Sequence, residues 1–151
     1  MLSIKDATVK GALREAAAYL AGQWAAQPQS DAAVRQDADP RLDAEVLLAH
    51  VLGVERLRLF VEPDKPVPAP ELAEFQRMIG ARGTGRPVAY LTGQKEFMSM
   101  KFRVGPGVLI PRPETELLVE LAAQRWRERF DHALYIADIG TGSGAIAVTL
   151  A

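Results

Sequence analysis

A glycine-rich turn lies near the C-terminal end of the chain and has the sequence Asp138-Ile139-Gly140-Thr141-Gly142-Ser143-Gly144. It follows the apolar run 134–139, which predicts a buried strand, and a helix is expected to begin at Ala145. Glycines let the backbone turn sharply and let a ligand approach the main chain, while the start of a helix offers unpaired N–H groups. Strand, turn and helix together predict the beginning of an α/β cofactor-binding domain.

Two classes of cofactor fit this turn. A dinucleotide site has the pattern G-x-G-x-x-G/A, and Gly140, Gly142 and Ala145 match it. A methyltransferase site adds an acid at the end of the strand, two residues before G-x-G-x-G, and Asp138 occupies that position. The phosphates of a dinucleotide need no carboxylate there, whereas a cofactor with an ammonium and a sulfonium group tolerates one. The pattern favours a methyltransferase, with a dinucleotide site and a purely structural turn as the alternatives.

The first half of the chain is expected to be helical. Residues 8–26 repeat apolar side chains at three- and four-residue spacing, which predicts an amphipathic helix. A second helix is expected to begin at Asp39-Pro40 and to end at Gly53, and a third to span 71–82. Residues 1–85 are therefore predicted to form a small all-α domain.

The pattern changes at Arg86. Apolar and polar residues alternate over residues 98–104, as in a half-buried strand, and Val88–Leu91 is expected to be the partner strand. With Thr92-Gly93 as the turn, these segments predict a β-hairpin within a linker that spans residues 86–110.

A further helix is expected over residues 114–130. Acidic residues occupy its first turn and arginines lie near its end, an arrangement that suits the helix dipole. This helix, together with the strand and helix on either side of the glycine-rich turn, predicts that residues 111–151 form the first part of the α/β domain. The predicted fold class is α+β overall: an all-α N-terminal domain, a linking β-hairpin, and the first strand and helix of an α/β domain.

Composition excludes several kinds of site. The 151 residues carry 18 lysines and arginines against 19 aspartates and glutamates, so net charge does not attract the chain to nucleic acid or an anionic membrane. The absence of cysteine excludes disulfides, thiolate zinc sites and a cysteine nucleophile. The two histidines, His50 and His132, lie in dissimilar surroundings, so no metal site is expected. No signal peptide or membrane span is evident, and a cytoplasmic protein is expected.

Four segments occur in an order and at a spacing that invite comparison with a known family. They are Arg86-Pro87-Val88-Ala89-Tyr90-Leu91-Thr92-Gly93, Glu96-Phe97, Val108-Leu109-Ile110-Pro111-Arg112-Pro113-Glu114-Thr115-Glu116 and residues 138–147. Together they resemble the bacterial release factor glutamine methyltransferase (PrmC/HemK) family. The resemblance implies a helical substrate-recognition domain, a linking hairpin and a Rossmann-like domain that binds S-adenosyl-L-methionine.

The resemblance also implies roles for individual residues. Asp138 is expected to shape the cofactor pocket and Phe97 to line it, and the loop under the cofactor's amino-acid end is expected to consist of Gly140, Thr141, Gly142, Ser143 and Gly144. The substrate side is expected to be lined by Arg112, Pro113, Glu114 and Thr115. A core phenylalanine and a solvent-exposed arginine are the alternatives for Phe97 and Arg112. By spacing alone, the proline-flanked segment also fits a simple helix start with acids near the dipole.

Members of the family transfer a methyl group to the side-chain N5 of a glutamine in the Gly-Gly-Gln loop of class-1 peptide chain release factors. They hold that amide with an Asn-Pro-Pro-Tyr motif, and this sequence contains no asparagine. The resemblance therefore implies an N-terminal fragment without catalytic residues of its own, inactive alone and monomeric, with no direct contact to nucleic acid or membrane. Residues 133–151 are expected to be weakly anchored in such a fragment.

Other function classes stay open at this point. A ribosomal-protein glutamine methyltransferase shares overlapping motifs. A nucleic-acid adenine methyltransferase also uses Asn-Pro-Pro-Tyr-type motifs, but the near-zero net charge disfavours it. A non-catalytic docking module is the alternative that needs only the helical domain, and an NAD-dependent enzyme is the least favoured.

Overall fold

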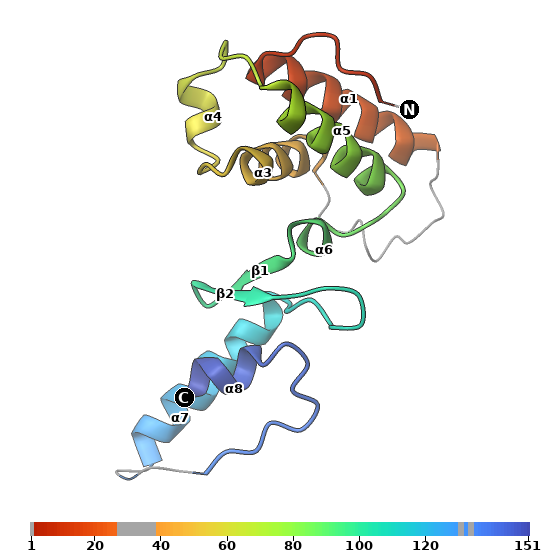
Figure 1. Ribbon diagram of the computed structural model, residues 1–151. Helices are drawn as coiled ribbons and strands as arrows, with labels where there is room; N and C mark the ends of the chain where they lie inside the picture. The colour runs from red at the N-terminus through yellow and green to blue at the C-terminus, as the bar shows by residue number, and fades with distance from the viewer. Residues whose placement is uncertain (1, 27–38, 130–131, 133–134) are drawn as a thin grey trace. The chain divides into compact units, whose positions relative to one another are not determined.

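The computed structural model describes residues 2–26, 39–129, 132 and 135–151 (Figure 1). The chain divides into two compact units, residues 1–92 and residues 93–151. We call them the helical unit and the hairpin unit. The predicted class is confirmed, because helices dominate and the strands of the described residues form an antiparallel pair.

The helical unit contains α1 (Val9–Ala26), α3 (Pro40–Leu52), α4 (Arg58–Val61), α5 (Ala69–Gly83) and α6 (Val88–Thr92). Helix α3 has both expected caps. The side chain of Asp39 accepts hydrogen bonds from the backbone N–H groups of Arg41 and Leu42, and Pro40 lies in the first turn. Gly53 ends the helix at φ 64°, a left-handed conformation that favours glycine. Helix α5 begins two residues before the expected start, because Pro70 fits its first turn.

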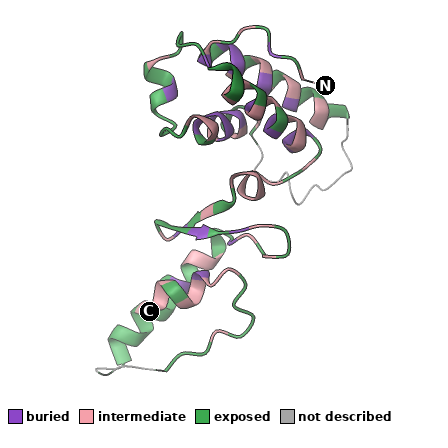
Figure 2. Cartoon of the chain, in the orientation of Figure 1, coloured by how far each residue is buried: buried purple, intermediate pink, exposed green. Residues whose placement is uncertain are grey.

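The core of the helical unit lies between α1, α3 and α5, which contact one another pairwise. Figure 2 shows the buried positions on the sides of these helices that face each other. Small residues on α1 let the other two helices approach, and the larger side chains fill the space between them. The fully buried members are Ala12, Ala16, Leu20, Ala44, Leu47, Leu48, Phe75 and Ile79.

A buried polar cluster joins the same helices. Arg82 of α5 is 3% exposed, and its Nε donates a 2.7 Å hydrogen bond to Oδ2 of Asp43 on α3. The guanidinium carbon lies 4.9 Å from the centroid of the Trp24 ring on α1, which is a cation–π contact. Desolvation raises the pKa of Asp43 above its usual value, although the hydrogen bond and charge of Arg82 oppose that shift. The cluster therefore depends on Arg82 for its charge balance.

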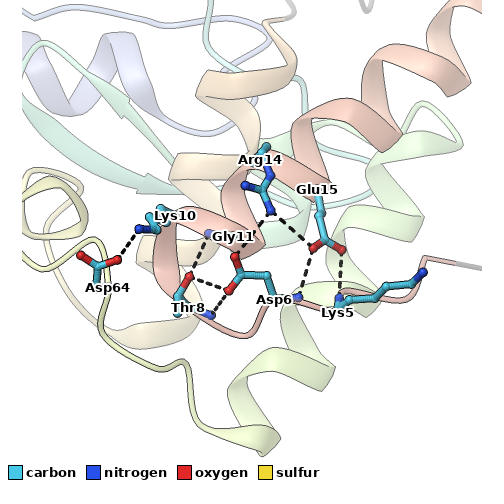
Figure 3. A network of polar contacts seen from close by, with 8 residues as sticks. All are labelled: Lys5, Asp6, Thr8, Lys10, Gly11, Arg14, Glu15 and Asp64. Atoms are coloured by element: carbon cyan, nitrogen blue, oxygen red, sulfur yellow. Dashed lines mark hydrogen bonds and ion pairs between the residues drawn. The ribbon is translucent and has the colours of Figure 1, made fainter.

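The start of α1 is held by a polar network (Figure 3). Oδ1 of Asp6 accepts hydrogen bonds from the backbone N–H and the hydroxyl of Thr8, at 3.1 and 2.7 Å, and these bonds lower the pKa of Asp6. Oγ1 of Thr8 accepts a bond from the N–H of Gly11. The carboxylate of Glu15 accepts the N–H groups of Lys5 and Asp6, which lowers the pKa of Glu15. Of the N–H groups that a helix start leaves unpaired, the network satisfies that of Gly11, and its other bonds fix the segment before the helix.

We expect Gly11→Ala to lower the melting temperature of the chain by about 5 °C. A Cβ at Gly11 would overlap Cγ of Asp6, so the Asp6 side chain would have to rotate and lose its bonds to Thr8. Thermal unfolding followed by circular dichroism measures the change. The matched control is Gly22→Ala in the same helix, where no atom of the residues that the structure describes lies within 4 Å of the new Cβ and helix propensity alone favours alanine. Equal melting temperatures for the two variants would contradict the expectation.

The hairpin unit begins with β1 (Gln94–Phe97) and β2 (Met100–Arg103), which pair antiparallel with Phe97 opposite Met100. Met98 and Ser99 form the connecting turn at φ 49° and 61°, as in a two-residue hairpin of the type I′ kind. The hairpin is therefore shorter than predicted, and its turn lies at Met98-Ser99 rather than at Thr92-Gly93.

The prediction that Val88–Leu91 is a strand is wrong, because this segment belongs to α6. The carbonyl of Pro87 accepts hydrogen bonds from the N–H groups of Tyr90 and Leu91, which starts a helical turn. Val88 and Leu91 lie three residues apart and pack against the core of the helical unit. Tertiary packing therefore overrides the strand preference of the valine.

The rest of the hairpin unit contains α7 (Glu114–Arg129) and α8 (Ala145–Leu150). A small core joins them to the hairpin, and the rings of Phe97 and Phe102 meet edge to face with centroids 6.1 Å apart. The buried members of this core are Phe97, Phe102, Val119 and Ala145. Helix α7 confirms the helix expected from residue 114, and residue 130 lies outside the described residues.

The expected buried strand over residues 134–139 requires correction. Residues 135–139 form no strand, and Tyr135 and Ile139 are fully exposed, at 107% and 96%; residue 134 lies outside the described residues. A strand needs a neighbour for its backbone hydrogen bonds. Among the described residues β1 and β2 pair only with each other, so no strand edge receives this segment.

Candidate functional site

The glycine-rich turn has the backbone conformation that its sequence requires. Gly140, Gly142 and Gly144 have φ angles of 85°, 58° and 80°, in the left-handed region that residues with a Cβ rarely adopt. The N–H of Gly144 donates a 2.9 Å hydrogen bond to the carbonyl of Thr141, whose hydroxyl donates a 2.7 Å bond to the carbonyl of Asp138. The alternate glycines thus bend the chain tightly before α8, and the threonine between them closes the turn.

The turn is open toward solvent. Among the described residues, no atom lies within 4 Å of the position that a Cβ on Gly140 would take, and the one neighbour at Gly142 is 3.8 Å away. The φ angles, rather than crowding by the protein, require glycine at these two positions. The open side leaves room for a ligand to approach the main chain.

Asp138 has an unsatisfied carboxylate oxygen beside this turn. Oδ2 of Asp138 is shielded from solvent and has no hydrogen-bond partner among the described residues. A shielded carboxylate oxygen without a donor is unfavourable, and an ammonium group would satisfy it. The ammonium group of a cofactor with a cationic amino-acid end could donate a hydrogen bond to Asp138. A dinucleotide phosphate has no such donor, so the unsatisfied oxygen does not favour a dinucleotide.

Phe97, the other residue expected at the cofactor, lies in the core of the hairpin unit. Its side chain is 1% exposed and belongs to the same buried cluster as Ala145, the residue that follows Gly144. The structure thus gives Phe97 the packing role of a core phenylalanine next to the start of α8. Its expected role toward the cofactor stays a prediction.

The proline-flanked segment forms an exposed turn before α7. Arg112, Pro113 and Glu114 are exposed and Thr115 is half-buried, whereas Pro111 is buried. The N–H of Thr115 donates a 3.0 Å bond to the carbonyl of Arg112, so the helical hydrogen bonding begins here. The segment is the helix start that its spacing predicts, and its expected contact with substrate stays a prediction.

Glu116 is a positioning residue whose contact with the hairpin turn was not predicted from the sequence. Its Oε1 accepts a 2.9 Å hydrogen bond from the backbone N–H of Met98, in the hairpin turn. This bond fixes the first turn of α7 to the residue after Phe97, although the two are 18 positions apart in sequence. The structure therefore brings the proline-flanked segment and the Glu96-Phe97 segment together. In the sequence, the only sign of this contact was the acidic residue at the end of the proline-flanked motif.

The described part of the chain contains no group of three or more His, Cys, Asp or Glu side chains that could hold a metal ion. Within the same ranges, none of the helices is both long enough and apolar enough to cross a membrane.

Comparisons with known proteins agree with one another. Residues 31–93 match the family model described as the PrmC N-terminal domain. The release factor glutamine methyltransferase of Nitratidesulfovibrio vulgaris is 41% identical over 98% of this chain and 45% of its own length. Proteins of the same name from Chlorobaculum tepidum and Vibrio cholerae are both 47% identical, over 75% and 74% of this chain and 40% and 38% of their own lengths. The chain thus spans less than half the length of these curated relatives.

Proposed function

The chain resembles the release factor glutamine methyltransferase family over 98% of its length, and on this premise we propose that it is part of a methyltransferase that acts on peptide chain release factors. The observation that carries the proposal is the turn after Asp138, with its three left-handed glycines and its unsatisfied carboxylate oxygen. That geometry, in a chain 41% identical to a named methyltransferase, supports a site for a cationic methyl donor.

We further propose S-adenosyl-L-methionine as the cofactor, which supplies the methyl group when bound. Asp138 would accept hydrogen bonds from its ammonium group. The main chain of the glycine-rich turn would approach its amino-acid end, through Gly140, Thr141, Gly142, Ser143 and Gly144. Phe97 would support the turn from the core, beside Ala145.

The proposed substrate is the glutamine of the Gly-Gly-Gln loop of a class-1 release factor, methylated at N5, and the proposed location is the cytoplasm. An amide nitrogen is a weak nucleophile because its lone pair is delocalised into the carbonyl. The rate therefore depends on holding that nitrogen in line with the methyl group. The exposed turn before α7 would help to hold the substrate, through Arg112, Pro113, Glu114 and Thr115.

The test is methyl transfer by the full-length protein that contains this chain. We expect radiolabelled methyl groups to pass from S-adenosyl-L-methionine to a purified class-1 release factor, and Asp138→Asn to weaken cofactor binding by about 10- to 100-fold in calorimetry. Asp64→Asn is the matched control, since Asp64 is 75% exposed and pairs with Lys10 in the helical unit. Absence of transfer by the unaltered protein would refute the function. Unchanged binding by Asp138→Asn would refute the role of that carboxylate alone.

A further inference from the structure

The hairpin turn Met98-Ser99 has a backbone conformation that its own residues do not favour. Met98 and Ser99 have φ angles of 49° and 61°, in the left-handed region where residues with a Cβ are strained. Two-residue turns of this kind usually contain asparagine, aspartate or glycine, and neither residue here is one of them. Such strain persists only where the surrounding structure imposes it, and it is concentrated at functional sites. The contacts that hold this turn therefore bear on function.

Two contacts hold the turn, and both involve Met98. The register of β1 and β2 ends with Phe97 opposite Met100, so the N–H of Met98 lies outside the ladder. Oε1 of the half-buried Glu116 accepts a 2.9 Å hydrogen bond from that N–H. The carboxylate makes this bond stronger than one between neutral groups. The side chain of Met98 provides the second contact, because it packs against the core of the hairpin unit.

The same core connects the hairpin turn to the glycine-rich turn. Met98 packs on the buried cluster that contains Phe97 and Ala145, and Ile146 of α8 packs on this cluster too. Ala145 directly follows Gly144, the last glycine of the turn that is proposed to approach the cofactor. A shift of the Met98 backbone would also displace Phe97, since the two residues are adjacent. A closely packed core transmits such a shift, so it would reach the start of α8.

We propose that Glu116 positions the site for the methyl donor. Its carboxylate holds the Met98-Ser99 turn in the left-handed conformation, and the hairpin in turn holds the start of α8 and the glycine-rich turn before it. Glu116 thus acts on cofactor affinity through the hairpin rather than by contact with the ligand. The inference rests on the proposed function for the identity of that ligand. All the contacts involved lie within the hairpin unit, so they do not depend on where the helical unit lies.

The experiment measures cofactor binding and turnover by the full-length protein. We expect Glu116→Ala to raise both the Kd, by calorimetry, and the KM of S-adenosyl-L-methionine about tenfold, while KM for a class-1 release factor changes less than about twofold. Partial unfolding would lower the concentration of active protein, and hence the apparent kcat, without raising either KM. The difference between the two KM values therefore separates positioning from loss of fold.

Two further variants of α7 serve as comparisons. Glu116→Gln keeps an oxygen that can accept the N–H of Met98, so its Kd should rise only about threefold or less. Glu120→Ala is the matched control, because Glu120 is an exposed glutamate one turn further along the same helix. The Kd of Glu120→Ala should equal that of the unaltered protein.

A second substitution tests whether Glu116 acts through the hairpin turn. Glycine adopts the φ of 61° at position 99 without strain, and Ser99 is exposed, so Ser99→Gly disturbs no packing. Glu116→Ala combined with Ser99→Gly should therefore recover most of the lost affinity, to within about threefold of the unaltered protein, because the turn then needs less support. Absence of recovery would overturn the proposal, since Glu116 would then act by another route.

The outcomes separate this inference from the proposed function. If Glu116→Ala bound the methyl donor as tightly as the unaltered protein, the inference would be wrong and the proposed function would stand. An equal rise in the KM values of cofactor and release factor would also overturn the inference alone. An unaltered protein that neither binds the methyl donor nor transfers a methyl group would overturn the proposed function and, with it, the role of Glu116.

Discussion

Replacement of Arg82 by methionine should destabilise the helical unit by about 3–5 kcal/mol. The methionine keeps much of the buried aliphatic stem but removes the guanidinium. Asp43 would then lose the 2.7 Å hydrogen bond from Nε, and Trp24 would lose the cation 4.9 Å from its ring. An unpaired carboxylate in this position is far more costly than the paired one, because Asp43 forms no ion pair with any other described residue. Urea unfolding at neutral pH measures the loss.

The same variant should be strongly pH-dependent. Burial already raises the pKa of Asp43 above the ordinary aspartate value of 3.8, and Arg82 partly opposes that rise. Without Arg82 the folded-state pKa should rise further, so the folded state binds more protons than the unfolded state over the interval above pH 3.8. Stability must then fall as pH increases through that interval, up to the raised folded-state pKa. We expect Arg82→Met to recover part of its loss near pH 4.5.

A double variant tests whether the charge of Asp43 causes the loss. Arg82→Met combined with Asp43→Leu removes both members of the pair, and replacement of a buried pair by apolar residues is often close to neutral. The double variant should therefore be more stable than Arg82→Met, and its stability should lose the added pH dependence. If both variants were equally destabilised at neutral pH, lost packing rather than an unpaired charge would explain the effect.

Local signals predicted the helices well. The start and end of α3 depend on Asp39, Pro40 and Gly53, all within one turn of the helix ends, and each acts in the structure as its chemistry predicts. The left-handed φ angles of the glycine-rich turn could also be predicted from local sequence, because glycines at alternate positions indicate them directly.

Contacts between distant residues were not predictable in this way. Arg82 and Asp43 are 39 positions apart, and no pattern in either helix indicates that they pair. The segment from Val88 to Leu91 has the composition of a strand, but its two apolar ends pack on helices that only the folded chain places beside them. Residues 135–139 show the converse case: the apolar composition of a buried strand is present, and neither β1 nor β2 pairs with the segment.

The glycine-rich turn provides the second large expected effect. Gly140→Val should weaken binding of S-adenosyl-L-methionine by the full-length protein by about 100-fold or more. Gly140 has φ 85°, where a β-branched residue is strained, and relief of that strain would move the carbonyl and N–H groups on either side. Because no atom of the described part of the chain lies within 4 Å of the added Cβ, the fold itself should tolerate the side chain. Calorimetric titration with the cofactor measures the affinity.

Gly85→Val is the control that distinguishes the effect of backbone strain on stability from a direct effect on cofactor binding. Gly85 has φ 96° and also has no atom of a described residue within 4 Å of its added Cβ, but it lies in the helical unit, after α5. Both variants should therefore lose a similar amount of stability, of about 1–3 kcal/mol, from the same conformational cost. Only Gly140→Val should lose cofactor affinity, because only that turn is proposed to bring its main chain against the ligand. If both variants bound the cofactor as the unaltered protein does, the turn would be structural, and the methyl donor would have to bind elsewhere.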